Sequence, residues 1–188
     1  SPLVQLWFGG VSAAAKPIGA KHCDTYALFG ESLGLVKGMM DELDGMASVH
    51  QRHLKYNLSF RPIIAPTEDA AWKKARQILQ SVENASKPSV RAPEAETAKR
   101  LSRLIDDGEI HDERLWVPIA AAAQGSGNST ALVGTPEQVA EAIAKYYDLG
   151  VAGVLIRGFD PFNDAVEFGK ELIPWIRDKI RQRDDARS

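Results

Sequence analysis

The stretch that most constrains the fold is residues 131–161, because it predicts a helix followed directly by a buried strand. Thr135 stands at an N-cap position, and Gln138 lies three residues later, where its side chain can complete a capping box. Gly150 supplies the positive φ with which many helices end. The nearly unbroken apolar run 151–156 then indicates a parallel strand covered on both faces.

The end of that strand carries candidate site residues. Residues 157–160 read Arg-Gly-Phe-Asp, so a cation and an aromatic side chain follow the strand directly. In α/β enzymes the carboxyl ends of parallel strands hold the ligand-binding residues. Arg157 and Phe159 are therefore candidates for a ligand site, and a strand-ending loop without such a role is the alternative.

The first residues predict another strand and helix. The apolar run 3–8 ends in Gly9 and Gly10, and Ser12 follows as an N-cap candidate. Exposed amides at such a turn bind anions, so Gly9, Gly10 and Ser12 are candidates for holding a phosphate, although a plain strand-to-helix turn has the same sequence. Pro17 predicts a kink or a late helix start.

Residues 24–29 predict a second strand, and a helix follows over 32–49. Glycines at 34, 38 and 45 lower the helix propensity of this segment, and close packing of the helix on a sheet would explain them. His50 and His53 share a helical spacing that metal ligands use, but no third ligand is spaced to complete a site. We therefore predict surface histidines and no metal.

Residues 56–65 predict a third strand, which Arg61 interrupts. A buried arginine needs a partner or a ligand, and the alternative is a solvent-facing position near the strand end. Thr67 predicts the N-cap of the next helix. The apolar stripe of that helix consists of Trp72, Ala75, Leu79 and Val82.

Residues 84–129 interrupt this regular alternation. A helix is predicted at 97–106, whereas 120–129 is rich in small residues and is expected to be flexible. A segment of this length between a helix and a strand is typical of a lid, a binding insertion or disorder. The closing helix begins at 163 with a kink at Pro174, and residues 181–188 are expected to fray.

The whole chain of 188 residues thus contains four strand–helix units and one insertion. Alternation of this kind predicts an α/β fold with a parallel sheet. Four strands make either half of a (βα)8 barrel of the TIM type or a small open sheet.

Composition excludes several classes of protein. A formal net charge of −2 without a basic stripe argues against nucleic-acid binding. No apolar run approaches the roughly 18 residues of a membrane span, and no secretory leader is visible. The single Cys23 rules out an internal disulfide and favours a reducing cytoplasm.

Four motifs occur in an order that is typical of one enzyme family. They are LWFGGVSAAA at 6–15, DTYALFGE at 24–31, LSFRPIIAPTEDAAW at 58–72 and TALVGTPEQVAEAIAKYYDLGV with LIRGFDP at 130–161. With these motifs the chain resembles the C-terminal half of a luciferase-like flavin-dependent monooxygenase, closest in pattern to the alkanesulfonate monooxygenase branch. The resemblance covers nearly all of the chain except about 84–118.

The resemblance implies a (βα)8 barrel, of which residues 1–188 supply the last four units with 84–129 as an insertion. It also implies reduced FMN, delivered by a separate NAD(P)H-dependent flavin reductase, that activates O2 to oxygenate a small organic substrate. For an alkanesulfonate the products are sulfite and an aldehyde. Gly9, Gly10 and Ser12 match the turn that lies near the flavin phosphate in that family.

The chain also departs from the alkanesulfonate branch. Ser59 and Arg61 occupy positions where that branch has an arginine and a histidine, and Phe159 and Pro161 occupy positions of a tyrosine and a histidine. The flavin scaffold is therefore expected without the usual sulfonate-handling groups. The substrate is then one that Arg61 and Arg157 can hold, with Phe159 in the pocket wall.

Two alternatives stay open at this point. One is a luciferase-like oxidoreductase that uses a deazaflavin. The other is a half barrel that is not catalytic by itself, because its two edge strands at 3–8 and 151–156 are expected to pair with a missing N-terminal half or with a second copy.

Overall fold

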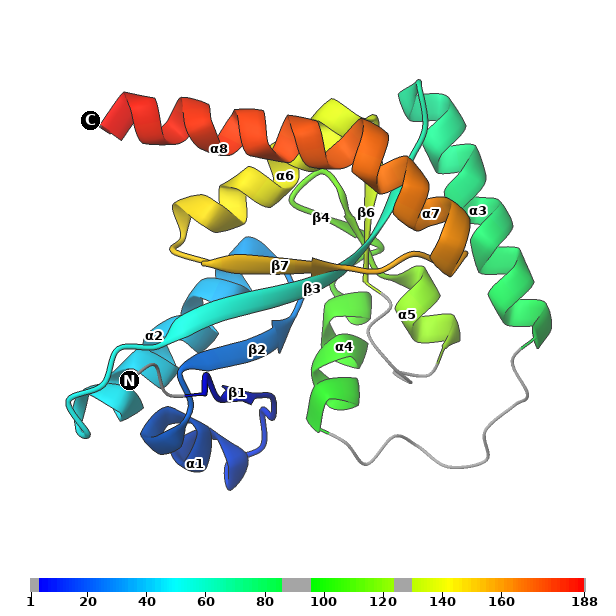
Figure 1. The fold of residues 1–188 in the computed structure, drawn as a ribbon. Helices are drawn as coiled ribbons and strands as arrows, with labels where there is room; N and C mark the ends of the chain where they lie inside the picture. The colour runs from blue at the N-terminus through cyan, green and yellow to red at the C-terminus, as the bar shows by residue number, and fades with distance from the viewer. Residues whose placement is uncertain (1–3, 86–95, 124–129, 188) are drawn as a thin grey trace.

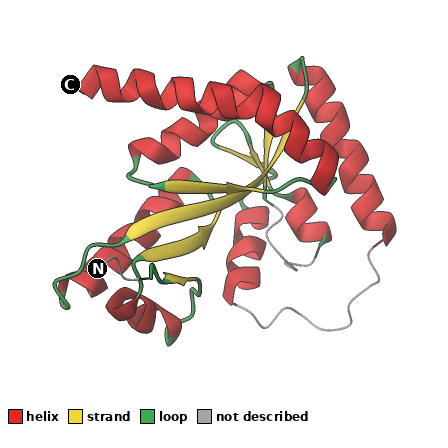
Figure 2. Cartoon of the chain, viewed as in Figure 1, coloured by secondary structure: helices red, strands yellow, loops and turns green. Residues whose placement is uncertain are grey.

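The computed structural model describes residues 4–85, 96–123 and 130–187. The strands are β1 (Trp7–Phe8), β2 (Thr25–Phe29), β3 (Lys55–Ile64), β4 (Ile110–His111), β5 (Leu115–Trp116), β6 (Ala131–Gly134) and β7 (Gly153–Ile156). The helices are α1 (Ala15–His22), α2 (Leu33–Ser48), α3 (Glu68–Ala85), α4 (Glu96–Asp106), α5 (Pro118–Ala122), α6 (Pro136–Asp148), α7 (Pro161–Glu167) and α8 (Ile173–Arg187), with a π-helical turn η1 (Phe168–Leu172) between the last two. Figure 2 distinguishes helices, strands and loops by colour.

The predicted parallel sheet is confirmed. β1, β2, β3 and β7 lie side by side in that order, and every pair among these neighbours is parallel. The far end of β3 pairs instead with β6, and β5 and β4 add two short antiparallel strands there. The result is an α/β fold whose sheet curls like half of a barrel, with helices α2 and α6 behind it and α8 running alongside β7 and α6 (Figure 1).

The two faces of the sheet differ in exposure. Side chains alternate between the two faces along a strand. On the face that the helices cover, the side chains of Tyr26, Leu58 and Phe60 are all buried. The opposite, concave face carries Phe29 and Leu155, which flank Ser59 in the strand register and are 37% and 51% exposed. The prediction that residues 151–156 are covered on both faces is therefore wrong. Helices cover the outer face of β7, and the described residues leave Leu155 open.

The helix and turn before β7 form as predicted. The Thr135 hydroxyl accepts a hydrogen bond from the Gln138 amide at 3.3 Å, and the Gln138 side chain accepts one from the Thr135 amide at 2.9 Å. Gly150 has a φ of 101°. Ile143 and Tyr146 bury the inner face of α6 against the sheet, with the Tyr146 ring 5.0 Å from the Phe60 ring.

The first strand and helix are shorter than predicted. β1 is confined to two residues, and α1 begins at Ala15 instead of directly after Ser12. The N-cap is Ala14, and Ser12 stabilises the turn before it, because its hydroxyl and carbonyl oxygens both accept from the Ala15 amide. Pro17 falls in the first helical turn, where a missing amide costs no helical hydrogen bond.

The explanation offered for the glycines of α2 is wrong. A Cβ atom built at Gly34, Gly38 or Gly45 would meet nothing within 4 Å, and all three positions are exposed. The helix buries its other face, with Val36 and Leu43 in the core. Helical phase places the glycines on the solvent side, so close packing does not require them.

Much of the described part of the insertion is packed into the protein core. The predicted helix at 97–106 is present as α4. Leu104, Leu115, Val117 and Ile119 are all at most 2% exposed. Residues 120–122 belong to α5, and 124–129 lie outside the described residues, so the flexibility expected of 120–129 stays a prediction. A lid function for 84–129 stays a prediction.

The C-terminal helix does not fray within the described residues. α8 continues to Arg187, because Arg183 and Arg187 both pair with Asp148, at 2.8 Å and 2.7 Å. The π-helical turn ends just before Pro174, which lacks the amide that would bond to Lys170. Among the described residues, no helix combines the length and the apolar character that crossing a membrane requires.

Candidate functional site

Arg61 and Arg157 meet at the carboxyl ends of two neighbouring strands. The ladder between β3 and β7 pairs Phe60 with Ile156, and the Arg157 amide continues it by donating to the Phe60 carbonyl oxygen at 3.1 Å. Arg61 therefore lies opposite Arg157, one position beyond the last ladder pair. Arg157 is two residues after Leu155 in the sequence, so the side chains of both arginines lie on the concave face of the sheet.

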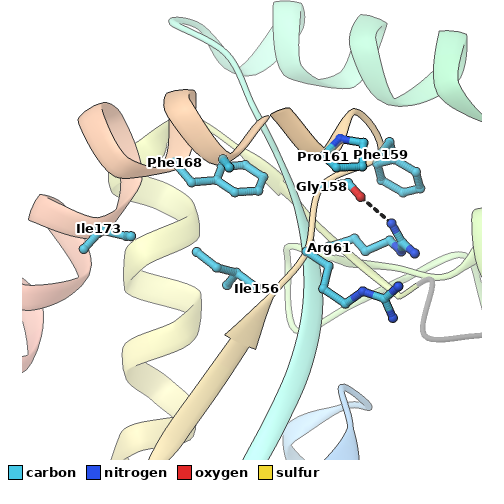
Figure 3. A pocket seen from close by; sticks show the side chains of 9 residues that line it. Arg61, Ile156, Gly158, Phe159, Pro161, Phe168 and Ile173 are labelled. Atoms are coloured by element: carbon cyan, nitrogen blue, oxygen red, sulfur yellow. Dashed lines mark hydrogen bonds between the residues drawn. The ribbon is translucent and has the colours of Figure 1, made fainter. Parts of the chain in front are cut away.

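These arginines line a cavity of about 550 Å³. Its other walls are apolar or glycine, with Ile156 from β7 and Phe168 and Ile173 from the segment after it (Figure 3). Phe159 and Pro161 complete the wall near the strand end. The structure brings Arg61, Arg157 and Phe159 together around one cavity, and their role stays a prediction.

Two neighbours hold the Arg61 side chain. Its guanidinium lies 4.9 Å from the centre of the Phe159 ring, a cation–π distance, and its Nη1 donates to the Gly158 carbonyl oxygen (Figure 3). Burial lowers the pKa of Arg61, the nearby charge of Arg157 lowers it further, and Asp164 opposes both. A guanidinium tolerates such shifts and keeps its charge at neutral pH.

The loop after β7 depends on Asp164, which sequence reasoning missed. Its Oδ2 accepts hydrogen bonds from the amides of Phe159 and Asp160, at 2.6 Å and 2.9 Å. A Cβ at Gly158 would lie 2.3 Å from the Asp164 Cβ, so only glycine allows this approach. A carboxylate in the first turn after the Asp160 N-cap was the available signal.

The turn predicted to hold a phosphate lies at the same end of the sheet. This turn, with Gly9, Gly10 and Ser12, directly follows β1. β1 and β7 are separated by three strand spacings, which corresponds to a distance of about 14 Å between the two strands. The Gly10 carbonyl accepts from the Tyr26 hydroxyl at 2.5 Å. In the described part of the chain, the amides of Gly10 and Ser12 have no hydrogen-bond acceptor.

This turn fits an anionic group. A Cβ at Gly10 would lie 3.0 Å from the Ala15 Cβ, so a larger residue there would crowd the start of α1. Amides without a protein acceptor beside a strand-to-helix turn are the donors that phosphate sites use. The residues present are therefore compatible with the phosphate of FMN.

The histidines do not form a metal site in the described residues. No group of three or more His, Cys, Asp or Glu side chains is close enough there to hold a metal ion. His50 and His53 lie on the exposed connection after α2, as predicted for surface histidines.

Comparisons with known proteins agree with this architecture. Riboflavin lyase with modified FMN and riboflavin superposes with a TM-score of 0.68 at 20% identity, over 92% of this chain and 42% of that one. DmoA from Hyphomicrobium sulfonivorans also reaches 0.68, at 15% identity over 92% and 41%. The coenzyme F420 dependent tetrahydromethanopterin reductase from Methanopyrus kandleri reaches 0.54 at 16% identity, over 91% and 50%.

These identities show a shared fold, and the chain spans half the length or less of these structures. The sequence profile described as luciferase-like monooxygenase matches residues 1–153, which is most of the chain. The chain belongs to the luciferase-like monooxygenase family.

Proposed function

We propose that this chain is the C-terminal half of a (βα)8 barrel in a flavin-dependent monooxygenase that oxygenates a small organic substrate. The observation that carries the proposal is the family match over residues 1–153. The phosphate-compatible turn and the arginine cavity lie at the carboxyl ends of parallel strands, where barrel enzymes place their active sites. Residues 1–188 would supply the last four units and 84–129 an insertion near the site.

A complete site requires another half barrel. Among the described residues, β1 pairs only with β2 and β7 only with β3, so both sheet edges are open. Trp7, Phe29 and Leu155 expose apolar surface on the concave face. Either the missing N-terminal half or a second copy would cover this surface, and we expect the isolated half to be inactive.

Size-exclusion chromatography with mass detection tests this assembly. We expect the 188-residue chain to form a dimer or to co-purify with a half-barrel partner, and Leu155→Glu to weaken that association. Leu35→Glu is the matched control, because Leu35 is 41% exposed on α2, away from the concave face. A stable monomer that binds no partner would contradict the half-barrel proposal.

FMN is the cofactor that we propose. Gly9, Gly10 and Ser12 would hold its phosphate, and the bound reduced flavin supplies the electrons with which O2 oxygenates the substrate. The strand ends would orient the flavin and the cavity walls would exclude water from it. In the assembled protein, Gly10→Val should weaken FMN binding measured by fluorescence quenching, and Gly38→Val on the exposed face of α2 should not.

Turnover tests the reaction directly. The assembled protein, supplied with FMN, NAD(P)H, O2 and a separate flavin reductase, is expected to consume an organic substrate; we expect both enzymes in the cytoplasm. An alkanesulfonate is one substrate to test, because it would yield measurable sulfite and an aldehyde. Absence of both FMN affinity and oxygenation across a substrate panel would refute the function.

A deazaflavin-dependent oxidoreductase is the second candidate. It is supported by the shared fold with the F420 dependent reductase, at a TM-score of 0.54. Titration of the assembled protein with FMN and with coenzyme F420 separates the two. Preference for the deazaflavin would replace the monooxygenase proposal.

A further inference from the structure

Tyr26 connects the buried face of β2 to the turn that follows β1. Its hydroxyl donates a hydrogen bond to the Gly10 carbonyl oxygen at 2.5 Å, and its side chain is fully buried. Burial raises the pKa of Tyr26 to about 12, so the hydroxyl keeps its proton and remains a donor at neutral pH. The turn is therefore tied to the core through the oxygen of one peptide group.

The ring of Tyr26 is held from two sides. Phe8 packs edge-on against it, with 5.7 Å between the ring centres. On the side of α1, a Cβ built at Gly19 would lie 2.5 Å from a ring carbon of Tyr26. Helix and strand thus leave the ring just enough room, and its hydroxyl has little freedom to move away from Gly10.

The turn receives little support from the sheet itself. In the described structure, β1 pairs with β2 only through Trp7 and Phe8. Beyond the strand, the Val11 side chain packs against the main hydrophobic core. The peptide group between Gly10 and Val11 therefore lies between two fixed points, which are the Tyr26 hydroxyl and the seat of the Val11 side chain.

The hydrogen bond from Tyr26 also determines where the Val11 amide points. The peptide bond between Gly10 and Val11 is trans, so its C=O and N–H groups point in opposite directions. Because the carbonyl points to the buried Tyr26 hydroxyl, the Val11 N–H points away from it. Within the described ranges this amide has no hydrogen-bond acceptor, and it joins those of Gly10 and Ser12 as a third successive donor for an anion.

Without this hydrogen bond the peptide group could turn over. Gly10 has no Cβ, so a rotation of the adjoining peptide plane meets less steric resistance there than at any other residue type. A reversed peptide would place the Gly10 carbonyl oxygen where the Val11 N–H now lies, and that oxygen would repel an anion. A single buried hydroxyl thus decides whether the turn offers a donor or an acceptor at this point.

We propose that Tyr26 is a positioning residue of the phosphate-compatible turn, and that its hydroxyl keeps the Val11 N–H directed at the phosphate group of the flavin. Tyr26 is buried and does not contact the ligand itself. This inference rests on the proposed function, because it concerns the turn that would hold FMN. It adds the Val11 amide to the groups contributed by Gly9, Gly10 and Ser12.

A comparison of FMN with riboflavin tests the role of Tyr26. The two flavins differ only in the phosphate group, so the ratio of their dissociation constants reports on the turn alone. In the assembled protein, Tyr26→Phe should lower the preference for FMN about tenfold, which corresponds to one hydrogen bond to a charged group, and should leave riboflavin affinity unchanged. Fluorescence quenching measures both. Equal weakening of the two flavins, which a merely structural role predicts, or an unchanged preference would overturn the proposal.

Tyr56→Phe is the matched control. Tyr56 lies beside Tyr26 in the strand register, is 2% exposed, and hydrogen-bonds through its hydroxyl to Asp44 on α2 at 2.6 Å. This variant loses a buried hydroxyl of the same kind away from the turn, so the preference for FMN should stay at the wild-type value. A similar fall in both variants would indicate a general loss of core packing and would contradict a specific role of Tyr26.

Inorganic phosphate tests the direction of the Val11 amide without a flavin. In isotope-labelled assembled protein, phosphate should shift the amide proton resonance of Val11 downfield, while that of Gly38 in the middle of α2 should not move. In Tyr26→Phe the same shift should require about tenfold more phosphate. A Val11 resonance that does not respond in the wild-type protein would refute the assigned orientation.

The two proposals fail differently. A phosphate response at Val11 that depends on Tyr26, without affinity for FMN, refutes the flavin function and leaves the role of Tyr26 intact. FMN binding with an unchanged preference over riboflavin in Tyr26→Phe refutes the role of Tyr26 alone.

Discussion

Gly30 gives the sharpest test of how the sheet packs against its helices. It directly follows β2, and its amide donates a hydrogen bond to the Ser59 carbonyl oxygen at 3.0 Å. A Cβ built there would lie 2.0 Å and 2.2 Å from two ring carbons of Phe60. Its φ is not positive, so a substitution with alanine meets a steric obstacle and no backbone strain.

The magnitude follows from how little Phe60 can move. Carbon atoms in contact normally lie about 3.5–4.0 Å apart, so the ring would have to shift by roughly 1.5 Å. Phe60 is 0% exposed and its ring packs 5.0 Å from that of Tyr146. Gly30→Ala should therefore cost about 1–3 kcal/mol, the usual range for overpacking a core.

Urea unfolding followed by circular dichroism measures this cost, and Tm should fall by about 2–4 °C for each kcal/mol. Gly38→Ala is the matched control, because its Cβ meets nothing within 4 Å in the middle of α2. That change should stabilise the chain by up to about 1 kcal/mol.

A double-mutant cycle identifies the clash itself. In a Phe60→Leu background the smaller side chain leaves room, so Gly30→Ala should cost at least about 0.5 kcal/mol less than in the parent. If Gly30→Ala is neutral, or costs the same in both backgrounds, the packing described between β2 and β3 is incorrect.

Three further predictions concern the network around α3 and α6 and the loop after β7. Hydrogen bonds from Arg114 lower the pKa of Glu68 from 4.5 to about 2, so the stability that Glu68 contributes is present above about pH 4.5 and is lost as the pH falls toward 2. Urea unfolding at stepped pH should show that Glu68→Gln removes this part of the acid dependence, and an unchanged profile would contradict it. Thr135→Ala removes the capping box of α6 and should cost about 1 kcal/mol in the same assay, while Thr135→Ser should retain most of it. Gly158→Ala should displace Asp164 from the loop after β7 and cost about 1–3 kcal/mol in the same urea assay; a neutral effect would show that the close approach of Asp164 to Gly158 does not stabilise the fold.

Much of the local structure was predictable because its causes are local. The Thr135 capping box, the positive φ of Gly150 and the apolar stripe of α6 depend on residues a few positions apart. Alternation of strands and helices likewise indicated the parallel sheet, since parallel strands need crossover connections. The order of the four sequence motifs indicated the luciferase-like family, and the family match over residues 1–153 confirms it.

Errors arose where solvent or distant segments decide the outcome. The glycines of α2 looked like packing positions, but which side of a helix meets the sheet depends on the phase of its whole apolar face. Leu155 belongs to an apolar run that predicted a doubly covered strand, yet its exposure depends on whether anything lies over the concave face. Arg183 and Arg187 resembled a solvated tail, but Asp148 on α6 holds them.

The candidate site shows the same division. Sequence alone identified Arg61, Arg157 and Phe159 as separate candidates at strand ends, because carboxyl ends of parallel strands are where such residues act. Only the register of β3 against β7 decided that Arg61 lies opposite Arg157, and only the folded loop brought Asp164 to the amide of Phe159. Strand register and loop packing arise from contacts across many residues of chain, so the local sequence does not contain them.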